Sequence, residues 1–248
     1  MSKSIHILGF HSVESLLRTN PESVIKVFIL NNRKDKRVNE LVNTLTNQNI
    51  AFSSVDKNDL DRIAKGEIHQ GVISEVILPP LLNEESLFKS IIDNSLKPLI
   101  LVLDSIQDPR NLGACLRSAN AAGVDYVVIN KDGSAPINAV VHKTSAGAIN
   151  SLKIFHVTNL SRTIKEMQKR GIWVIGLDGN SKSTIYGVDL TDATAVVMGS
   201  EGKGIRKLIK KTCDQIVTIP MSGNIESLNV SVATGIALFE SKRQRESS

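Results

Sequence analysis

Residues 99–123, LILVLDSIQDPRNLGACLRSANAAG, decide the fold class of this chain. The run at 99–104 is apolar up to Asp104 and predicts a strand that is buried on both faces. A helix is predicted over 111–122, because Asp108 can cap its start and Pro109 suits its first turn. Its apolar residues recur with a helical period, at Leu112, Cys115, Leu116 and Ala119. A buried strand that turns into a helix is typical of α/β proteins.

The same alternation continues to the C-terminus. Strands are predicted at 126–130, 152–156, 173–177, 195–198 and 215–219, and helices at 138–148, 160–170, 205–211 and 226–243. Nearly all-apolar strands separated by helices predict a parallel sheet covered on both faces. Ligands of such sheets bind beyond the carboxyl ends of the strands. The loops after Asp104, Leu177, Met198 and Ile219 are therefore the candidate site.

The N-terminal part of the chain forms a separate, smaller alternating unit. Strands are predicted at 24–30, 51–55 and 71–77, and helices at 9–18, 36–48 and 58–64. The pair Pro79-Pro80 stops regular structure, and a short helix at 84–94 follows. We therefore expect a domain at 1–78, a linker at 79–97 and a second domain at 98–248.

Composition narrows the class of protein. The 248 residues are enough for two domains, and a charge of +5 favours a polyanionic partner without establishing one. Cys115 and Cys213 lack the spacing of a metal site, so we expect reduced thiols and no metal. Residues 1–10 do not resemble a secretion signal, and the apolar run 99–103 is too short to span a bilayer. These features predict a soluble, cytoplasmic protein.

Two of the loops carry residues that packing does not explain. Asn111 and Arg117 lie off the apolar stripe of their helix, although both could simply be exposed there. The segment VVMGSEGKGI at 196–205 has glycines that allow a close approach of backbone to ligand, or a tight turn, with Glu201 inside it. It fails the phosphate-loop pattern, which needs glycine at Val197 and serine or threonine at Gly204, and it fails GxGxxG. An ATP or NAD enzyme is therefore disfavoured.

The third loop opens the last predicted helix, in IPMSGNIESLNVSVATGIALF at 219–239. Ser227 and Asn229 lie at the N-terminal end of this helix, where helix capping is the alternative to a functional role. The helix is apolar nearly all round, so we expect burial by its own domain or by a partner subunit.

Taken together, these loops resemble the three motifs of the SPOUT (TrmH/SpoU) ribose methyltransferases. The matching segments are 108–113 with 117–119, then 198–202, then 219–221 with 227–231. GFHSVESLL at 9–17 and HQGVISEV at 69–76 resemble the RNA-binding domain of that family, which has an L30e/L7Ae-like α/β fold. The likeness covers the whole chain.

The resemblance implies a parallel-sheet α/β domain with a deep trefoil knot, S-adenosylmethionine as the cofactor, and a homodimer with its sites at the subunit interface. It implies 2′-O-methylation of a guanosine in the peptidyl-transferase P loop of 23S ribosomal RNA. The family's functional positions are Asn111, Arg117, Glu201, Ser227 and Asn229. Its cofactor positions are Gly199, Ile219 and Leu228, to which we add the neighbouring strand-end residues Leu177, Met198 and Met221.

Arg117 is the residue expected to contact the target nucleotide, since a guanidinium can clamp a phosphate with two hydrogen bonds. The family's arginine is also proposed to accept the hydroxyl proton, which is unusual chemistry for a group that is almost always protonated. Two other functions stay open. One is methylation of a transfer RNA or another ribosomal RNA nucleotide, and the other is a non-catalytic RNA-binding factor for ribosome assembly.

Overall fold

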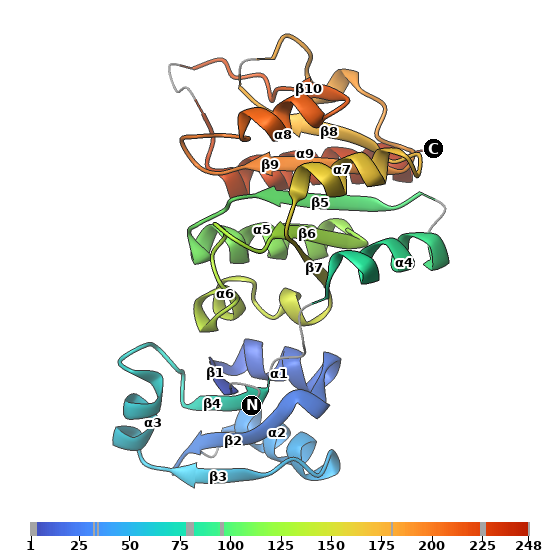
Figure 1. The fold of residues 1–248 in the computed structure, drawn as a ribbon. Coiled ribbons are helices and arrows are strands. Elements are labelled where there is room, and N and C mark those ends of the chain that lie inside the picture. Colours follow the sequence, from blue (N-terminus) through green and yellow to red (C-terminus); the bar gives the residue numbers. More distant parts are fainter. Residues whose placement is uncertain are drawn as a thin grey trace. The chain divides into compact units, whose positions relative to one another are not determined.

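The computed structural model describes residues 4–31, 33, 35–77, 82–94, 97–179, 181–223 and 227–247. The chain divides into two compact units, drawn in Figure 1. The first comprises residues 1–80 and 137–151, and the second comprises 81–136 and 152–248. Pro79-Pro80, the predicted stop before the linker, lies outside the described residues. The predicted helix that follows is present as α4, Glu84–Asn94.

The first unit is built on a four-stranded sheet in the order β1-β4-β2-β3. Its strands are β1 (Ser4–Leu8), β2 (Val24–Leu30), β3 (Phe52–Val55) and β4 (Val72–Ile77). β2 runs parallel to β3 and antiparallel to β4, which pairs antiparallel with β1. The sequence reading missed β1, a short strand that completes the sheet through residues more than sixty positions away, such as Ile77 opposite Ser4.

Three helices of this unit pack on its sheet through apolar residues. α1 (Phe10–Thr19) and α2 (Lys36–Asn47) share one buried cluster with β2, in which Phe10, Leu41 and Val27 take part. α3 (Lys57–Ala64) contributes Leu60 to a second cluster with Ile73 of β4. All three helices lie within two residues of their predicted positions.

The segment 137–151 belongs to this first unit, whereas the sequence prediction placed it in the C-terminal domain. It was predicted as one helix at 138–148, but it forms α6 (Ala139–Thr144) and a separate 3-10 turn at Ala148–Asn150. The helix stops because Ala146 and Gly147 take left-handed conformations, with φ of 50° and 83°. The Ser15 hydroxyl of α1 donates to the Gly147 carbonyl at 3.3 Å and ties the turn to this unit.

The second unit has a six-stranded, entirely parallel sheet in the order β10-β8-β9-β5-β6-β7, as the alternation of strands and helices predicts. Its strands are β5 (Leu99–Asp104), β6 (Tyr126–Asn130), β7 (Lys153–Val157), β8 (Trp173–Leu177), β9 (Thr194–Gly199) and β10 (Gln215–Val217). Figure 1 shows α5 (Pro109–Ala122) and α9 (Val230–Glu246) on one face of this sheet. It shows α4, α7 (Leu160–Gln168) and α8 (Lys207–Thr212) on the other.

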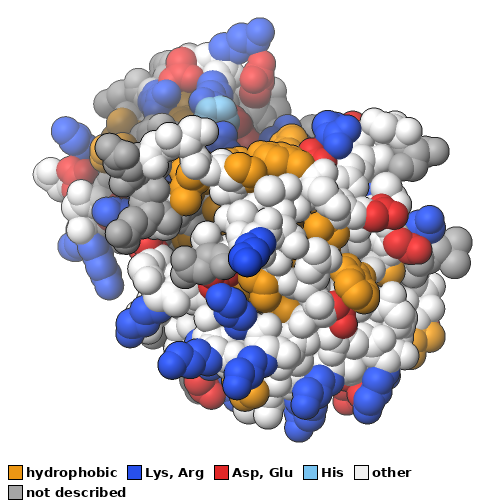
Figure 2. Space-filling model, turned by 90° about the horizontal axis from the view of Figure 1, so that it is seen from above, with side chains coloured by type: hydrophobic (Ala, Val, Ile, Leu, Met, Phe, Trp, Pro, Cys, Tyr) orange, Lys and Arg blue, Asp and Glu red, His pale blue; other side chains and the backbone are white. Residues whose placement is uncertain are grey.

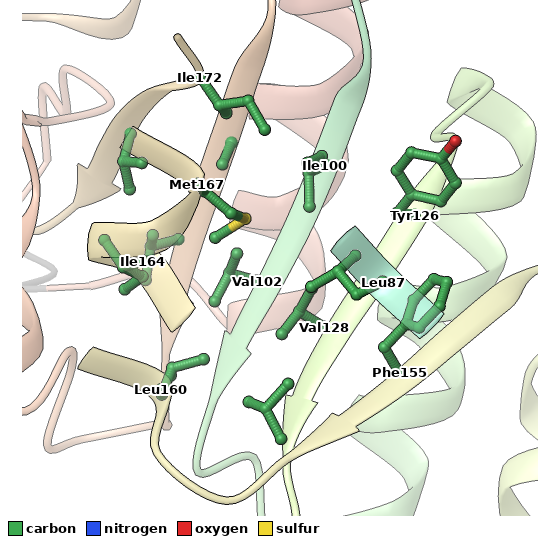
Figure 3. Close-up of a cluster of buried hydrophobic side chains, with 14 of the residues drawn as sticks. Leu87, Ile100, Val102, Tyr126, Val128, Phe155, Leu160, Ile164, Met167 and Ile172 are labelled. Carbon is green, nitrogen blue, oxygen red and sulfur yellow. The ribbon is translucent and has the colours of Figure 1, made fainter. Parts of the chain in front are cut away.

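The main core of the second unit lies between the sheet and the face that carries α4, α7 and α8. Figure 3 shows how Leu87, Ile164 and Met167 come from the helices towards the strands. They meet Ile100, Val102 and Val128, which are fully buried. Because alternate residues of a strand point to opposite faces, both sides of β5 are filled, and every residue of this strand is buried. The strand ends are thereby held rigidly.

The helix after β5 begins and ends as its sequence predicts. The Asp108 side chain accepts a hydrogen bond from the Arg110 backbone N–H at 2.8 Å, and Gly123 ends the helix with φ of 79°. The predicted apolar stripe is fully buried, at Leu112, Cys115, Leu116 and Ala119. In the described part of the chain, no helix has the length and apolarity to cross a membrane.

Candidate active site

A pocket of about 740 Å³ opens at the carboxyl ends of β8, β9 and β10. Its volume falls in the range of roughly 300–1,000 Å³ typical of small-molecule sites. It is lined by all of the predicted cofactor residues, Leu177, Met198, Gly199, Ile219, Met221 and Leu228. Glu201 and Ser227 line it too. Three of the four loops singled out in the sequence therefore build one site.

Three of the predicted functional side chains form a hydrogen-bonded chain. The Asn111 amide Nδ2 donates to Glu201 Oε2 at 2.8 Å. The Asn229 amide Nδ2 donates to Asn111 Oδ1 at 3.0 Å. These two hydrogen bonds join the start of α5, the loop after β9 and the start of α9, which are far apart in sequence. Because each amide both donates and accepts, the orientation of Asn111 is fixed from two sides.

Asn229 also caps α9, so it has both of the roles that the sequence allowed, as a helix cap and as a member of the candidate site. Its Oδ1 accepts from the Ser231 backbone N–H at 2.9 Å and from the Ser231 hydroxyl at 2.6 Å. The capping uses the oxygen of the side chain and leaves the nitrogen for Asn111. α9 begins at Val230, and its predicted first residue, Glu226, lies outside the described residues.

The glycine at the end of β9 is required by the close approach of two backbone segments within one tight loop. A Cβ on Gly199 would lie 2.0 Å from the Gly204 carbonyl carbon and 2.1 Å from the Ile205 nitrogen. The Gly204 N–H donates to the Ser200 carbonyl at 2.8 Å and closes this loop. The sequence left two explanations for these glycines, a close approach of the backbone to a ligand or a tight turn. At Gly199 the approaching group is the chain itself.

Arg117 stands apart from this hydrogen-bonded chain. Its side chain is exposed on α5, and among the described residues it has no hydrogen bond or ion pair. Ser227 is likewise exposed, although it lines the pocket. The structure therefore brings together Asn111, Glu201 and Asn229, places Ser227 at the same pocket and leaves Arg117 outside the group.

Two buried or half-buried carboxylates hold the loops of the site, and the sequence reading did not single them out as site residues. Asp104, fully buried at the end of β5, accepts from the Arg206 Nε at 2.7 Å and from its backbone N–H at 2.9 Å. Asp178 lines the pocket and pairs with Lys210 at 2.9 Å. Each follows or ends a parallel strand, and this position was the signal that could have identified them.

Neither cysteine is placed for nucleophilic chemistry. Burial raises the pKa of the Cys115 thiol to about 11, and its sulfur lies 3.4 Å from the Thr234 hydroxyl between α5 and α9. Burial raises the pKa of Cys213 to about 12, with Asp214 and Asp104 adding to the shift. Within the described residues, His, Cys, Asp and Glu side chains form no group of three that could hold a metal ion.

Comparison with known proteins gives a consistent picture over the full length. The SpoU rRNA Methylase family matches residues 98–239, and the RNA 2′-O ribose methyltransferase substrate binding family matches residues 6–80. The chain is 46% identical over 243 residues to the 23S rRNA (guanosine-2′-O-)-methyltransferase RlmB of Haemophilus ducreyi, covering 98% of each chain. It is 44% identical over 239 residues to RlmB of Escherichia coli K12, covering 96% of this chain and 98% of that protein.

A solved structure shares the fold over the same length. The SpoU methyltransferase AviRb of Streptomyces viridochromogenes, crystallised with S-adenosylmethionine, has a TM-score of 0.81 at 21% identity. That comparison covers 99% of this chain and 92% of AviRb. The family match covers more than half of the chain, and the curated relatives match nearly all of it. The chain therefore belongs to the SpoU rRNA methylase family, whose members are RNA methyltransferases.

Proposed function

We propose that this protein transfers the methyl group of S-adenosylmethionine to the ribose 2′-hydroxyl of a guanosine in 23S ribosomal RNA. The observation that carries the proposal is the pocket at the ends of β8, β9 and β10, bordered by the Glu201–Asn111–Asn229 chain. RlmB proteins of 42–47% identity carry this activity in their names. The likeness to AviRb, which binds S-adenosylmethionine, supports the same cofactor.

The pocket suits such a cofactor. Leu177, Met198 and Ile219 supply apolar walls for an adenine ring, and the backbone around Gly199 and Leu228 offers hydrogen-bonding groups to its polar edge. When bound, the cofactor supplies an activated methyl group on a sulfonium. Calorimetric titration tests the assignment: S-adenosylhomocysteine should bind, and ATP and NAD should not. Binding of ATP or NAD in its place would refute the proposal.

The residues of the site mainly have to orient the hydroxyl, because methyl transfer needs the attacking oxygen in line with the bond that breaks. Asn111, held by Glu201 and Asn229, is the group whose position is fixed most firmly. We assign it and Asn229 to positioning the substrate, and Glu201 and Ser227 to supporting the loops around it. These assignments predict a loss of methyl transfer without a loss of cofactor binding when Asn111 is changed.

Arg117 is assigned the role of a phosphate clamp on the target nucleotide. Its exposed guanidinium is free of ion pairs within the described residues, so it is available to a partner. Single-turnover methyl transfer should collapse in Arg117→Ala and stay badly impaired in Arg117→Lys, which keeps the charge but loses the planar fork. Near-normal turnover in Arg117→Ala would remove this residue from the mechanism.

The homodimer is supported by an apolar stripe on α9. Val230, Thr234, Ala237 and Leu238 are buried within their own unit, whereas Val232 and Phe239 are 52% and 47% exposed. Val232, Ile236 and Phe239 recur at the spacing of one helix face, which we assign to the subunit interface. Light scattering at micromolar protein should give about twice 27.0 kDa. A monomer with full activity would contradict this assignment.

The same proposal assigns a different role to each of the two units. The second unit carries the trefoil knot and the chemistry, and residues 1–78, with an L30e/L7Ae-like fold, bind RNA. Within the predicted linker at 79–97, α4 instead belongs to the second unit, whose core contains its Leu87. The match of residues 6–80 to a substrate-binding family supports this role. The match of residues 98–239 to the SpoU rRNA Methylase family supports the knot as part of the proposal.

The substrate of the proposal is a guanosine in the peptidyl-transferase P loop, and the site of action is the cytoplasm. The rival substrate is transfer RNA, since the TrmH/SpoU tRNA modifying enzyme of Aquifex aeolicus is 32% identical over 66% of this chain, with a TM-score of 0.57. The relatives that match nearly the whole chain favour ribosomal RNA. The two substrates are distinguished by measuring the transfer of a labelled methyl group to a large-subunit RNA transcript and, in parallel, to transfer RNA.

A further inference from the structure

A second cavity adjoins the proposed cofactor pocket. It has a volume of about 380 Å³ and is lined by Ser105, Gln107, Ser200 and residues 203–207. It shares Ser200, Lys203 and Gly204 with the first pocket. The cavity lies at the carboxyl ends of the neighbouring strands β5 and β9, where Asp104 pairs with Gly199. A ligand in it would therefore lie next to a ligand of the first pocket.

The charged groups of this cavity are positive. Lys203, Arg206 and Lys207 all line it. The acidic side chains nearby are already engaged, Asp104 by Arg206 and Glu201 by Asn111. Among the residues that the structure describes, no carboxylate pairs with Lys203 or Lys207. Figure 2 shows Lys and Arg side chains spread over the face seen from the β10 and α8 end of the second unit.

One lining residue, Ser105, is held in a strained, fixed conformation. Ser105 has a left-handed backbone, with φ of 63°, which is uncommon for a residue with a side chain. Its N–H donates to Asn130 Oδ1 at 2.8 Å, and the Ser134 hydroxyl donates to the same oxygen at 3.0 Å. Ser105 Oγ in turn donates to Asp104 at 3.2 Å. Such strain persists only where the surroundings fix it, and it is common at ligand sites.

These features suit one kind of ligand. Two lysines that have no ion pair among the described residues, a third cation held by a buried carboxylate, and the side-chain amide of Gln107 match an anion with several acceptor oxygens. The cavity contains no apolar floor of the kind that holds an adenine ring, because Ile205 is its only large apolar lining residue. A phosphodiester fits this chemistry, as does the carboxylate of a methionine group.

We propose that this cavity binds a backbone phosphate of the RNA, next to the methylated nucleotide, through Lys203 and Lys207. The inference rests on the proposed function, since it takes the substrate to be an RNA. It adds a second phosphate contact to the one assigned to Arg117. Lys207 binds RNA without touching the cofactor pocket, whereas Lys203 borders both.

The test compares Lys207→Ala with Lys211→Ala in the full chain. Lys211 is exposed on the same helix, α8, but does not line the cavity, so its loss removes the same charge from a different place. Binding of a large-subunit RNA transcript is measured by fluorescence anisotropy at several salt concentrations, with S-adenosylhomocysteine saturating. Lys207→Ala should flatten the log–log salt slope by about 0.7 and weaken binding, and Lys211→Ala should leave both close to wild type.

A second variant tests the cavity without removing a lysine. Gln107→Glu places a carboxylate beside Lys203 and Lys207, so it should weaken RNA binding while calorimetry with S-adenosylhomocysteine stays unchanged. If Lys207→Ala or Gln107→Glu alters S-adenosylhomocysteine binding and spares RNA binding, the anion is the cofactor's carboxylate and the inference is wrong. Equal RNA binding by Lys207→Ala and Lys211→Ala would also overturn it.

The inference and the proposed function fail in different ways. Wild-type protein that binds the transcript but transfers no methyl group would refute the function and leave the phosphate contact standing. Wild-type protein that methylates the transcript, with Lys207→Ala matching Lys211→Ala in salt dependence, would refute the phosphate contact alone.

Discussion

Replacing Gly199 by alanine tests the close backbone approach between residues 199 and 204–205, which line the pocket and its neighbouring cavity. The new Cβ would lie 2.0 Å from the Gly204 carbonyl carbon, where ordinary contact begins at 3.4 Å, so the 204–205 backbone must retreat by about 1.4 Å (3.4 − 2.0). Backbone cannot rotate away as a side chain can. The retreat also stretches the Gly204-to-Ser200 hydrogen bond of 2.8 Å. The loop that moves, at 199–205, contains Glu201 and lines the pocket.

The expected cost combines two effects. Overpacking costs about 1–3 kcal/mol and a lost hydrogen bond about 0.5–1.5 kcal/mol, so Gly199→Ala should destabilise the second unit by about 2–4 kcal/mol. For a protein of this size that lowers the melting temperature by roughly 4–16 °C. Calorimetric titration should also show weaker binding of S-adenosylhomocysteine.

Gly202→Ala is the matched control in the same loop. Gly202 has φ of 75°, but a Cβ there would meet nothing within 4 Å. Its cost is therefore limited to the left-handed backbone, about 1–2 kcal/mol. If Gly199→Ala lowers the melting temperature and cofactor binding no more than Gly202→Ala does, the close approach of residues 204–205 does not constrain position 199 and the prediction is wrong.

Three further predictions concern the site and the buried groups. Asn111→Ala should lower single-turnover methyl transfer on the order of 100-fold with cofactor binding unchanged, whereas Asn120→Ala on the same helix should be silent; equal activity would contradict the positioning role. Cys115 and Cys213, with pKa values raised by burial to about 11 and 12, should resist a thiol reagent at pH 8 until the protein is denatured. Burial lowers the pKa of His142 from 6.5 to about 4, so the unfolded chain binds the proton first and stability should fall as the pH falls through this window. Urea unfolding at pH 7 and pH 5 measures this, and the difference should shrink in His142→Gln.

The parallel sheet was predictable because its strands carry the signal locally. β5, β6 and β9 are short, mostly apolar runs that are buried at every residue, and their alternation with helices indicates a parallel sheet. β1 carried no such signal, because its five residues show mixed burial and its pairing is set by β4. A helix was predicted at 138–148, but the membership of segment 137–151 in the first unit depends on tertiary contacts that no local pattern encodes.

The candidate site was predictable in part for a related reason. Residues at the ends of parallel strands must converge, so the loops that supply Met198, Glu201 and Ile219 could be placed at one edge. The hydrogen bonds between Asn111, Glu201 and Asn229 depend on the exact separation of α5 from α9, which sequence spacing does not give. The close backbone contact at Gly199 could not be predicted either, because it too depends on distances that the sequence does not give.

The most direct test of the central claim maps ribose 2′-O-methylation on ribosomal RNA from cells with and without this gene. One guanosine of the large-subunit RNA should lose its methyl group when the gene is removed. Wild-type protein should restore the mark, and Asn111→Ala should not. An unchanged methylation map of the large-subunit RNA, with a mark lost from a transfer RNA, would contradict the assigned substrate.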